Sequence, residues 1–261
     1  MNVKFFKYQG AGNDFVLIDN RDLQFNANDT ALVAQLCDRR FGVGADGLML
    51  LQQRAGYDFE MVYYNADGNP GSMCGNGGRC IVSFAKHLGI IDRSTRFLAV
   101  DGEHEATIND AADWVSLKMI DVDGVNTDGE DFVLNTGSPH YVKIVNNLKE
   151  LDVFTAGRAI RYNDSYREAG INVNFAEAIE GGYQVRTYER GVEDETLACG
   201  TGVTAVAIAM AWHNNQLGEL HTPVKAMGGD LTIRFFHLGD GVFKDIYLEG
   251  PAKLVFEGFL S

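Results

Sequence analysis

The chain has 261 residues, of which 46% are hydrophobic and 22% charged, a composition typical of a globular protein that buries a full core. Its formal net charge of -14 argues against a nucleic-acid partner, because phosphate binding needs a basic surface. No apolar run approaches the roughly 18 residues of a membrane span, and the first residues lack a secretory signal, so we expect a cytoplasmic protein without a membrane partner.

Short segments that alternate or run apolar predict strands along the whole chain. In chain order they are FVLID (15–19), GLMLL (47–51), FEMVYY (59–64), WVSLKMI (114–120), YVKIV (141–145), YQVRTY (183–188), LTIRFF (231–236) and AKLVF (252–256). Helical patterns are fewer: residues 29–41 with Asp29 as the cap, and two segments rich in small apolar residues that follow Cys74 and Cys199. Many strands with few helices predict an α+β fold rather than a doubly wound parallel sheet.

One spacing recurs between the two parts of the chain. Cys199 in CGTG lies 125 residues after Cys74 in CGNG, and Gly137 lies 125 residues after Gly12. The segment GINVNF (170–175) lies at the same offset from ADGLML (45–50). We therefore predict a duplicated half. The N-terminal half is expected over residues 1–120, joined by a last strand at about 251–261, and the C-terminal half over residues 121–250.

The cysteines fall into two kinds. None of the four forms a CxxC pair, so we expect no metal site, and Cys37 and Cys80 are interpreted as buried core residues. Cys74 and Cys199 each stand at a glycine-rich turn where a helix is expected to begin. Unpaired N–H groups and the positive end of a helix can hold a carboxylate there and favour a thiolate.

Two such thiols suit the inversion of a carbon centre. One group removes a proton and the other delivers a proton to the opposite face, while helix N-termini stabilise the developing carbanion. A two-base amino-acid epimerase is therefore the favoured hypothesis. A thiol redox or anion-binding protein remains the alternative from another class. A pyridoxal-phosphate racemase is disfavoured because no lysine lies in either cluster, and we expect no cofactor.

Polar residues accompany each cysteine block. Asn65 follows a strand nine residues before Cys74, and Glu189 and Arg190 occupy the matching location before Cys199. Adjacent opposite charges can address the amino and carboxylate groups of one ligand, although a surface ion pair is the alternative interpretation. The other candidates are Asn13, Asn172 and His140, while Asp14 is expected to cap a turn.

Taken together, these residues resemble the diaminopimelate epimerase family. The resemblance covers nearly the whole chain and rests on GAGNDFVLID, NADGNPGSMCGNGGRC, GSPH, INVNF and YERGVEDETLACGTG, in family order. It implies a cofactor-independent amino-acid epimerase that interconverts LL- and meso-2,6-diaminopimelate in lysine and peptidoglycan precursor synthesis. It also implies a homodimer with two pseudo-symmetric halves, each a mixed or antiparallel sheet wrapped around a helix, and an active site between the halves.

The resemblance also implies roles for single residues. Cys74 and Cys199 would be acid and base, and His140 and Glu189 would assist proton transfer. Glu189 would also hold the distal amino group of the substrate. The remaining substrate contacts would come from Asn13, Asn65, Gly75, Asn76, Asn172, Arg190, Gly200 and Thr201.

Three positions depart from the common family pattern. Gly47 stands where many members carry a substrate-contacting Gln, Ser138 stands where many carry Asn, and the loop over residues 190–199 is one residue longer. These departures concern substrate contacts and not the thiols. A related isomerase of the same fold, such as a proline racemase-like enzyme, is the closest alternative, whereas phenazine-type isomerases lack the cysteine pair.

Overall fold

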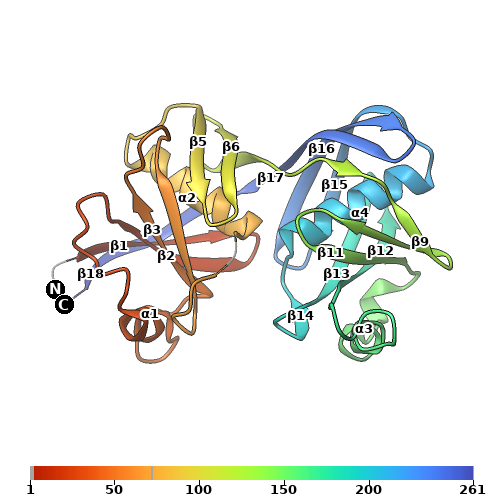
Figure 1. The fold of residues 1–261 in the computed structure, drawn as a ribbon, viewed down its shortest axis with the longest axis horizontal. Coiled ribbons are helices and arrows are strands. Elements are labelled where there is room, and N and C mark those ends of the chain that lie inside the picture. Colours follow the sequence, from red (N-terminus) through yellow and green to blue (C-terminus); the bar gives the residue numbers. More distant parts are fainter. Residues whose placement is uncertain (1–2, 72, 261) are drawn as a thin grey trace. The chain divides into compact units, whose positions relative to one another are not determined.

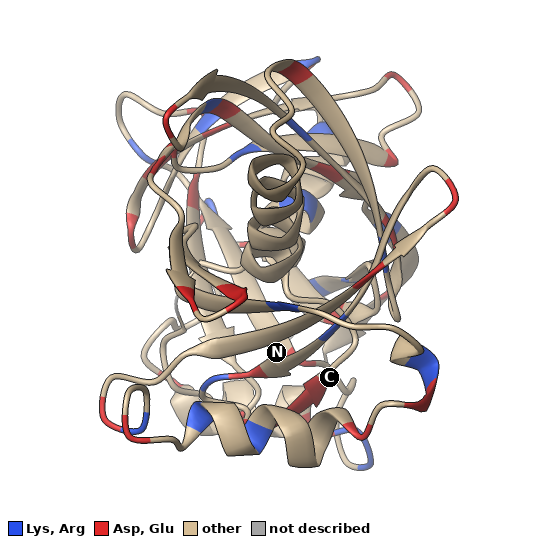
Figure 2. Cartoon of the chain, turned by 90° about the vertical axis from the view of Figure 1, so that its right-hand side faces the viewer, with Lys and Arg blue, Asp and Glu red and all other residues tan. Residues whose placement is uncertain are grey.

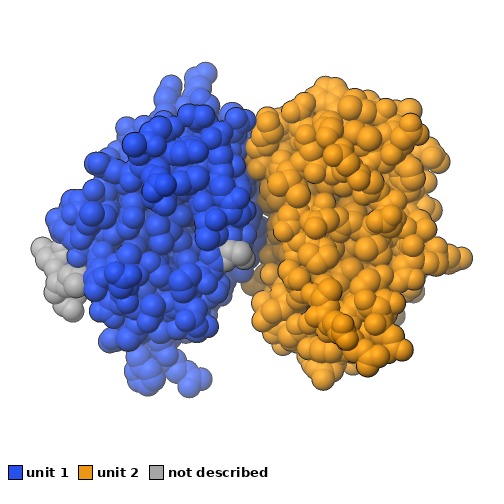
Figure 3. Space-filling model, viewed as in Figure 1, with its two compact units in different colours: residues 1–117, 250–261 blue, residues 118–249 orange. Residues whose placement is uncertain are grey.

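The computed structural model describes residues 3–71 and 73–260. The chain divides into two compact units, which Figure 3 shows in different colours. The first unit comprises residues 1–117 and 250–261, and the second comprises residues 118–249. Among the described helices, none has the length and apolar character needed to cross a membrane.

The first unit is a mixed sheet. Its strands run in the order β18-β1-β2-β3-β4-β5-β6-β7, with parallel pairs at β2–β3 and β4–β5 and antiparallel pairs elsewhere. The strands are β1 (Val3–Gly10), β2 (Asn13–Asp19), β3 (Gly47–Gln52), β4 (Glu60–Asn65), β5 (Ser94–Ala99), β6 (Gly102–Ile108), β7 (Trp114–Lys118) and β18 (Lys253–Leu260). Its helices are α1 (Thr30–Cys37) and α2 (Gly75–His87).

The second unit repeats this ladder. Its strands run β9-β10-β11-β12-β13-β15-β16-β17-β8, with parallel pairs at β11–β12 and β13–β15, and β14 forms a hairpin with β13. The strands are β8 (Val122–Asp123), β9 (Asn126–Asp128), β10 (Asp131–Asn135), β11 (Pro139–Ile144), β12 (Asn172–Ile179), β13 (Gly182–Glu189), β14 (Asp194–Thr196), β15 (Gly218–Ala226), β16 (Gly229–Gly239) and β17 (Val242–Pro251). Its helices are η1 (Leu148–Glu150), α3 (Val153–Arg161) and α4 (Gly200–His213).

Strand register confirms the predicted duplication. In the first unit Phe15 of β2 pairs with Gly47 of β3, and in the second unit His140 of β11 pairs with Asn172 of β12. Both residues of the second pair lie 125 positions after their counterparts, since 140 − 15 and 172 − 47 give the same number. The repeat seen in three sequence landmarks is therefore a repeat of backbone pairing.

Each unit encloses one central helix. The residues of α2 are buried from Asn76 to Ala85, and this helix packs against β1, β2, β3, β6 and β18. Helix α4 is buried over nearly its whole length and packs against strands β10 to β13, β15 and β16. Both helices are labelled in Figure 1, and Figure 2 looks onto the second unit, where strands surround a central helix. Small residues such as Gly and Ala let the surrounding strands approach these helices closely.

A second helix covers the outer face of each sheet. In the first unit, Val33 and Leu36 of α1 pack on Val16 and Ile18 of β2. The parallel pair β2–β3 is therefore apolar on both faces. In the second unit, α3 covers β12 and β13 through a core that includes Val153, Val173, Phe175 and Tyr188.

Helix α1 ends earlier than the sequence pattern predicts. Asp29 caps its first turn as expected, accepting a hydrogen bond from the Leu32 amide. The helix stops at Cys37 rather than continuing to Phe41, because Asp38 is extended and its carboxylate accepts from the amides of Arg40 and Phe41. An aspartate that binds nearby backbone N–H groups favours a turn over another helical turn.

Candidate active-site residues

The two cysteines occupy equivalent backbone positions in the two units. Cys74 is the N-cap of α2, with φ −113° and ψ 126°, and Cys199 is the N-cap of α4, with φ −108° and ψ 112°. The Gly78 amide bonds to the Cys74 carbonyl at 2.7 Å, and the Val203 amide bonds to the Cys199 carbonyl at 2.9 Å. The N–H groups of the residues between have no acceptor within the helix, which makes each N-terminus suited to an anion.

The second glycine of each motif allows close packing at the helix start. A Cβ at Gly202 would lie 2.4 Å from the side-chain oxygen of Asn174 and 3.4 Å from Cys199 Sγ. A Cβ at Gly77 would meet Met49 Sδ at 3.3 Å. The requirement for glycine is therefore strict in the second unit, where the Asn174 side chain occupies the space that a Cβ would need. It is weaker in the first unit, where the nearest atom belongs to the flexible side chain of Met49.

In the first unit, a chain of oriented amides leads to the N-terminus of α2. Asn76 donates through Nδ2 to Asn13 Oδ1 at 2.6 Å, and Asn13 donates through Nδ2 to Asp46 Oδ2 at 2.9 Å. At the other end, Arg79 Nη2 donates to Asn76 Oδ1 at 2.9 Å. A cation fixes one amide oxygen and a carboxylate fixes the other amide nitrogen, so both asparagines have a defined orientation.

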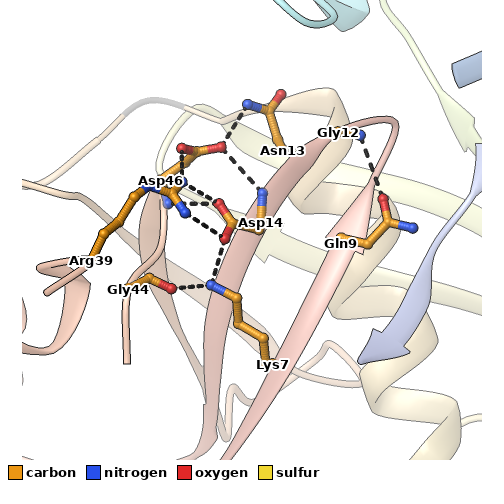
Figure 4. A network of polar contacts seen from close by, with 8 residues as sticks. All are labelled: Lys7, Gln9, Gly12, Asn13, Asp14, Arg39, Gly44 and Asp46. Atoms are coloured by element: carbon orange, nitrogen blue, oxygen red, sulfur yellow. Dashed lines mark hydrogen bonds and ion pairs between the residues drawn. The ribbon is translucent and has the colours of Figure 1, made fainter. Parts of the chain in front are cut away.

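An ionic cluster anchors the carboxylate end of this chain (Figure 4). Asp14 is bound by Lys7 at 2.6 Å and by Arg39 at 2.6 Å, and Arg39 also reaches Asp46 at 2.7 Å. Lys7 additionally donates to the Gly44 carbonyl. Burial opposes ionisation of Asp14, but hydrogen bonds from Arg39 and Lys7 prevail and lower its pKa to about 2. The expected turn cap is thus wrong: Asp14 is the centre of an ion-pair network.

Arg79 is a fully buried cation on the first turns of α2. Besides Asn76, its guanidinium contacts the carbonyls of Gly75 and Pro251, at 3.3 and 3.5 Å. Burial lowers its pKa to about 10, and the groups that oppose this shift are the thiols Cys80 and Cys74. No carboxylate of the described residues is among these groups. Arg79 therefore remains charged at neutral pH without an acidic side chain beside it.

Asn65 and the glycines near it define the rest of the first half. Asn65 is exposed at the end of β4, and its side-chain amide makes no hydrogen bond within residues 3–71 and 73–260. The ring of Tyr63 fills the space beside Gly47 and Gly71: a Cβ at either glycine would lie 2.5 Å from that ring. Tyr63 thus occupies the space that a longer residue at position 47 would need.

In the second unit, a buried polar chain leads to His140. Thr187 donates to Asn174 Oδ1 at 2.9 Å, and Asn174 Nδ2 lies 3.1 Å from His140 Nδ1 and 3.0 Å from the Tyr141 carbonyl. Because an amide nitrogen only donates, His140 Nδ1 is the acceptor and Nε2 carries the proton of the neutral ring. Burial, reinforced by the charge of Arg190, lowers the pKa of His140 to about 3. Its Nε2 has no hydrogen-bond partner among the described residues.

Glu189 and Arg190 do not form the ion pair considered as the alternative interpretation. Glu189 accepts a hydrogen bond from Thr196 at 2.8 Å, and burial raises its pKa although this bond opposes the shift. Arg190 is exposed and bonds to the Ala169 carbonyl at 3.2 Å and to Ser138 Oγ at 3.4 Å. Within the described chain, neither residue has an ion-pair partner, which leaves both charges available to a ligand.

Asn172 holds the neighbouring segments together. Its Nδ2 donates to Ser138 Oγ at 2.9 Å and to the Pro139 carbonyl at 3.1 Å, and its Oδ1 accepts from the Arg190 amide at 2.9 Å. Ser138, one of the departures from the family pattern, therefore links Asn172 to the Arg190 side chain. Much of the hydrogen-bonding capacity of Asn172 is used inside the protein, which favours a positioning role.

The remaining contacts fix the start of α4 and the loop before it. Thr136 donates to the Thr201 carbonyl at 2.8 Å, and Thr201 Oγ1 lies 3.4 Å from Cys199 Sγ. The longer loop forms the β13–β14 hairpin, in which Glu193 has a positive φ of 58°. The Glu193 carboxylate accepts from Tyr162 at 3.0 Å, which ties the loop to α3.

The sequence interpretation missed several polar residues that contact the predicted residues or their partners: Lys7, Arg39, Asp46, Tyr63, Arg79, Asn174 and Thr187. One signal was present, since Asn174 follows Asn172 at the two-residue period of a strand and so lies on the same face. The two expected core cysteines are confirmed: Cys37 and Cys80 are buried, and burial raises their pKa values to about 11 and about 12. In the described part of the chain, no three metal-binding side chains gather into a cluster.

Comparison with known proteins gives the family. A family model described as diaminopimelate epimerase matches residues 5–123 and 132–255. The chain is 51% identical over 256 residues to a diaminopimelate epimerase of Flavobacterium psychrophilum, with 98% of this chain and 99% of the relative covered. The chain belongs to the diaminopimelate epimerase family. It is also 44% identical to the diaminopimelate epimerase of Chlorobaculum tepidum, with 97% of this chain and 99% of the relative covered. The chain is therefore an isomerase.

Solved structures show the fold. A phenazine biosynthesis protein of Bacillus anthracis has a TM-score of 0.76 at 14% identity, covering 100% of this chain and 99% of that one. A hydroxyproline epimerase of Agrobacterium vitis has a TM-score of 0.68 at 12% identity, covering 99% and 92%. At such identities the likeness concerns the fold alone, and it confirms the α+β class predicted from the sequence.

Proposed function

We propose that this protein epimerises LL- and meso-2,6-diaminopimelate without a cofactor, using Cys74 and Cys199 as the acid–base pair. The observation that carries the proposal is that both cysteines are N-caps of buried helices at equivalent positions of a structural repeat. The family assignment and the names of the full-length relatives support the substrate. On this basis we infer a role in lysine and peptidoglycan precursor synthesis.

The chemistry uses one thiolate and one thiol. The thiolate removes the α-proton of one amino-acid end and becomes a thiol. The thiol on the opposite face of that carbon gives its proton to the carbanion and becomes a thiolate. The product is the inverted carbon, and the two sulfurs have exchanged their protonation states, which must be reset before the same direction can run again.

Helix N-termini supply the stabilisation that the carbanion needs. The N–H groups of Gly75, Asn76, Gly200 and Thr201 would bind the carboxylate next to the reacting carbon, where negative charge develops. Asn13 acts on this group through Asn76, whose amide it orients. His140, a neutral donor at Nε2, and Glu189, whose raised pKa suits proton exchange, would assist on the side of Cys199.

The second amino-acid end of the substrate needs its own contacts. Arg190 and Glu189, which have no ion-pair partner among the described residues, would bind its carboxylate and amino group. Asn65 and Asn172 complete the candidate contacts, Asn172 chiefly by holding Arg190 in place. We further propose a homodimer that works in the cytoplasm, where a reducing environment keeps both thiols active.

The test is isotope exchange. Purified protein in D₂O with a thiol reductant should incorporate deuterium at the α-carbon of LL- and meso-diaminopimelate and interconvert them, in a preparation without cofactor absorbance. L-proline, run in parallel, should not exchange. Exchange into proline alone would establish a proline-type racemase instead, and exchange into neither substrate would refute the epimerase proposal.

A further inference from the structure

Arg79 is a buried charge that the proposed reaction does not yet use. Its side chain is fully buried, and its hydrogen bonds to Gly75 and Asn76 place the guanidinium at the N-terminus of α2. This is an unfavourable place for a cation, because the N-terminal end of a helix is itself positive. A charge in this position needs an anion nearby to stabilise it.

The described residues leave few candidates for that anion. No carboxylate acts on Arg79, and the two thiols that do are Cys80 and Cys74. Cys80 stays neutral, since burial raises its pKa to about 12. The remaining counter-charge within the unit is the sulfur of Cys74, which is only half buried at the helix N-cap.

The other charged groups around α2 neither neutralise the charge of Arg79 nor supply a second unpaired buried cation. The cluster in Figure 4 contains two cations and two carboxylates and is balanced. Tyr8 of β1 stays neutral because burial raises its pKa. The further charged or titratable residues on strands packed against α2 are exposed or paired with another side chain, namely Lys4, Asp19, Glu103, His104, Glu105, Lys253 and Glu257.

The second unit has no equivalent cation. The residue 125 positions after Arg79 is Thr204, which is buried and donates to the Gly200 carbonyl at 2.9 Å. Helix α4 contains no Lys or Arg. Nearby His140 is neutral, because burial and the charge of Arg190 lower its pKa to about 3. Cys199 therefore has the helix N-terminus but no buried cation behind it.

We propose that Arg79 holds Cys74 as the thiolate in the unliganded enzyme, so that Cys74 begins as the base and Cys199 as the acid. This inference rests on the proposed two-thiol function, and it adds which thiol is deprotonated before the substrate binds. Arg79 is a positioning residue in this scheme: it contacts Asn76 and the helix start and acts on the substrate only through them and through the charge on Cys74.

The experiment measures each thiol separately. Reduced protein without substrate is alkylated with iodoacetamide between pH 5 and 10, and peptide mass spectrometry gives the rate at Cys74 and at Cys199. For each cysteine we compare the pH at which the alkylation rate is half of its maximum. This pH does not depend on how easily iodoacetamide reaches the sulfur. In the wild type we expect Cys74 to titrate at lower pH than Cys199.

Variants at position 79 assign the effect to the charge. Arg79→Gln should move the Cys74 curve upward by about one pH unit or more, roughly a tenfold loss of rate on the acidic limb, and leave the Cys199 curve in place. Arg79→Lys should keep Cys74 low. Arg93→Gln, which removes an exposed arginine paired with Asp110 in the same unit, should change neither curve.

The outcomes separate this inference from the function. An unshifted Cys74 curve in folded Arg79→Gln, or a wild-type Cys199 that titrates below Cys74, would overturn it. If Arg79→Gln does not fold, the wild-type order and the Arg79→Lys curve still decide. Deuterium exchange into diaminopimelate by the same wild-type preparation tests the epimerase proposal independently.

Discussion

Helices α2 and α4 have the same backbone design and different chemistry around it. Each begins at a cysteine N-cap with nearly the same dihedral angles and is enclosed by strands in the same ladder order. Around α2 the supporting groups are ionic, with Arg79 and the cluster of Figure 4. Around α4 the buried groups hydrogen-bonded to the helix start and to each other are neutral, with Thr204, Asn174 and a histidine held uncharged, and the charged residues Glu189 and Arg190 lie at the end of β13 and just after it. The duplicated backbone places a helix N-terminus at each cysteine, while the side chains set a different charge environment at each of them.

Other matched positions follow the same division. Asn65 of the first unit corresponds to Arg190 of the second, Phe15 to His140, and Gly47 to Asn172, each at an offset of 125 residues. A symmetric site would treat both amino-acid ends of a substrate alike. In the proposed epimerase, these differences would let the protein bind the reacting end and the distal end of the substrate differently.

The largest expected effect is the loss of either thiol. Cys74→Ala and Cys199→Ala should each lower epimerisation by about 10³-fold, because one face of the carbon loses its proton donor or acceptor. Conversion of LL- to meso-diaminopimelate is the readout, and circular dichroism checks the fold. Cys37→Ala, in the core of the first unit, should keep its activity. A near-normal rate in either catalytic variant would contradict the two-thiol mechanism.

A substitution at Arg190 tests the difference between this position and its counterpart in the first unit, Asn65. Arg190→Lys should weaken substrate binding by roughly 2–5 kcal/mol, because an ammonium cannot replace the paired bonds of a guanidinium to a carboxylate. Steady-state kinetics with diaminopimelate measures this change. Arg167→Lys, at an exposed ion pair with Asp164, is the matched control. Equal kinetics in the two variants would show that Arg190 is only a surface residue.

His140 should make the free energy of unfolding fall as the pH is lowered. Its folded-state pKa of about 3 lies below the ordinary 6.5, so its contribution is complete above pH 6.5 and is lost as pH falls toward 3. At pH 4 the loss should be on the order of 3 kcal/mol. His140→Gln should flatten the fall in unfolding free energy between pH 7 and 4, measured in urea.

This pH range separates His140 from the ionic cluster. Asp14, whose folded-state pKa of about 2 lies below the ordinary 3.8, loses its contribution mainly below pH 4, so Asp14→Asn should leave the slope from pH 7 to 5 unchanged. Parallel stability curves for His140→Gln and the wild type would mean that the histidine is not held neutral by burial.

The smallest effect concerns Gly47, whose counterpart is Asn172. Gly47→Ala should destabilise the protein by roughly 1–3 kcal/mol, because its Cβ would lie 2.5 Å from the Tyr63 ring and from the Tyr64 carbonyl. In a Tyr63→Ala background the penalty should shrink but not vanish, since the carbonyl remains. A double-mutant cycle in urea measures the coupling, and strict additivity would show that the ring can move away at no cost.

Strands and central helices could be predicted because their patterns are local. Each of the eight predicted segments overlaps a strand of the structure, although four of them extend past the strand by one or two residues, and both helices begin directly after the cysteines. Helix α3 was missed because it is short, contains Gly157 and buries few residues of its own. Strand β1 was missed because two lysines interrupt its apolar pattern, and Lys7 is buried only through its pairing with Asp14.

The supporting groups of the candidate site could not be predicted in the same way. Lys7, Asp14, Arg39 and Asp46 come from three separate parts of the chain, and the parallel pairing of β2 with β3 brings Asp14 beside Asp46. The sequence pattern gave Arg79 no role, and its interest comes from complete burial without a carboxylate, which depends on the surrounding strands. Motifs indicate where chemistry occurs, whereas folding determines which charges accompany it.

The pairing of β1 with β18 has a consequence for synthesis on the ribosome. Val3 pairs with Leu260 and Gln9 with Lys253. Strand β1 of the first unit therefore lacks one of its two strand partners, β18, until the whole second unit has been translated. The second unit, a continuous stretch of residues 118–249, can complete its own ladder earlier. The part of the protein that is made first can therefore complete its sheet only when the last strand of the chain has been made.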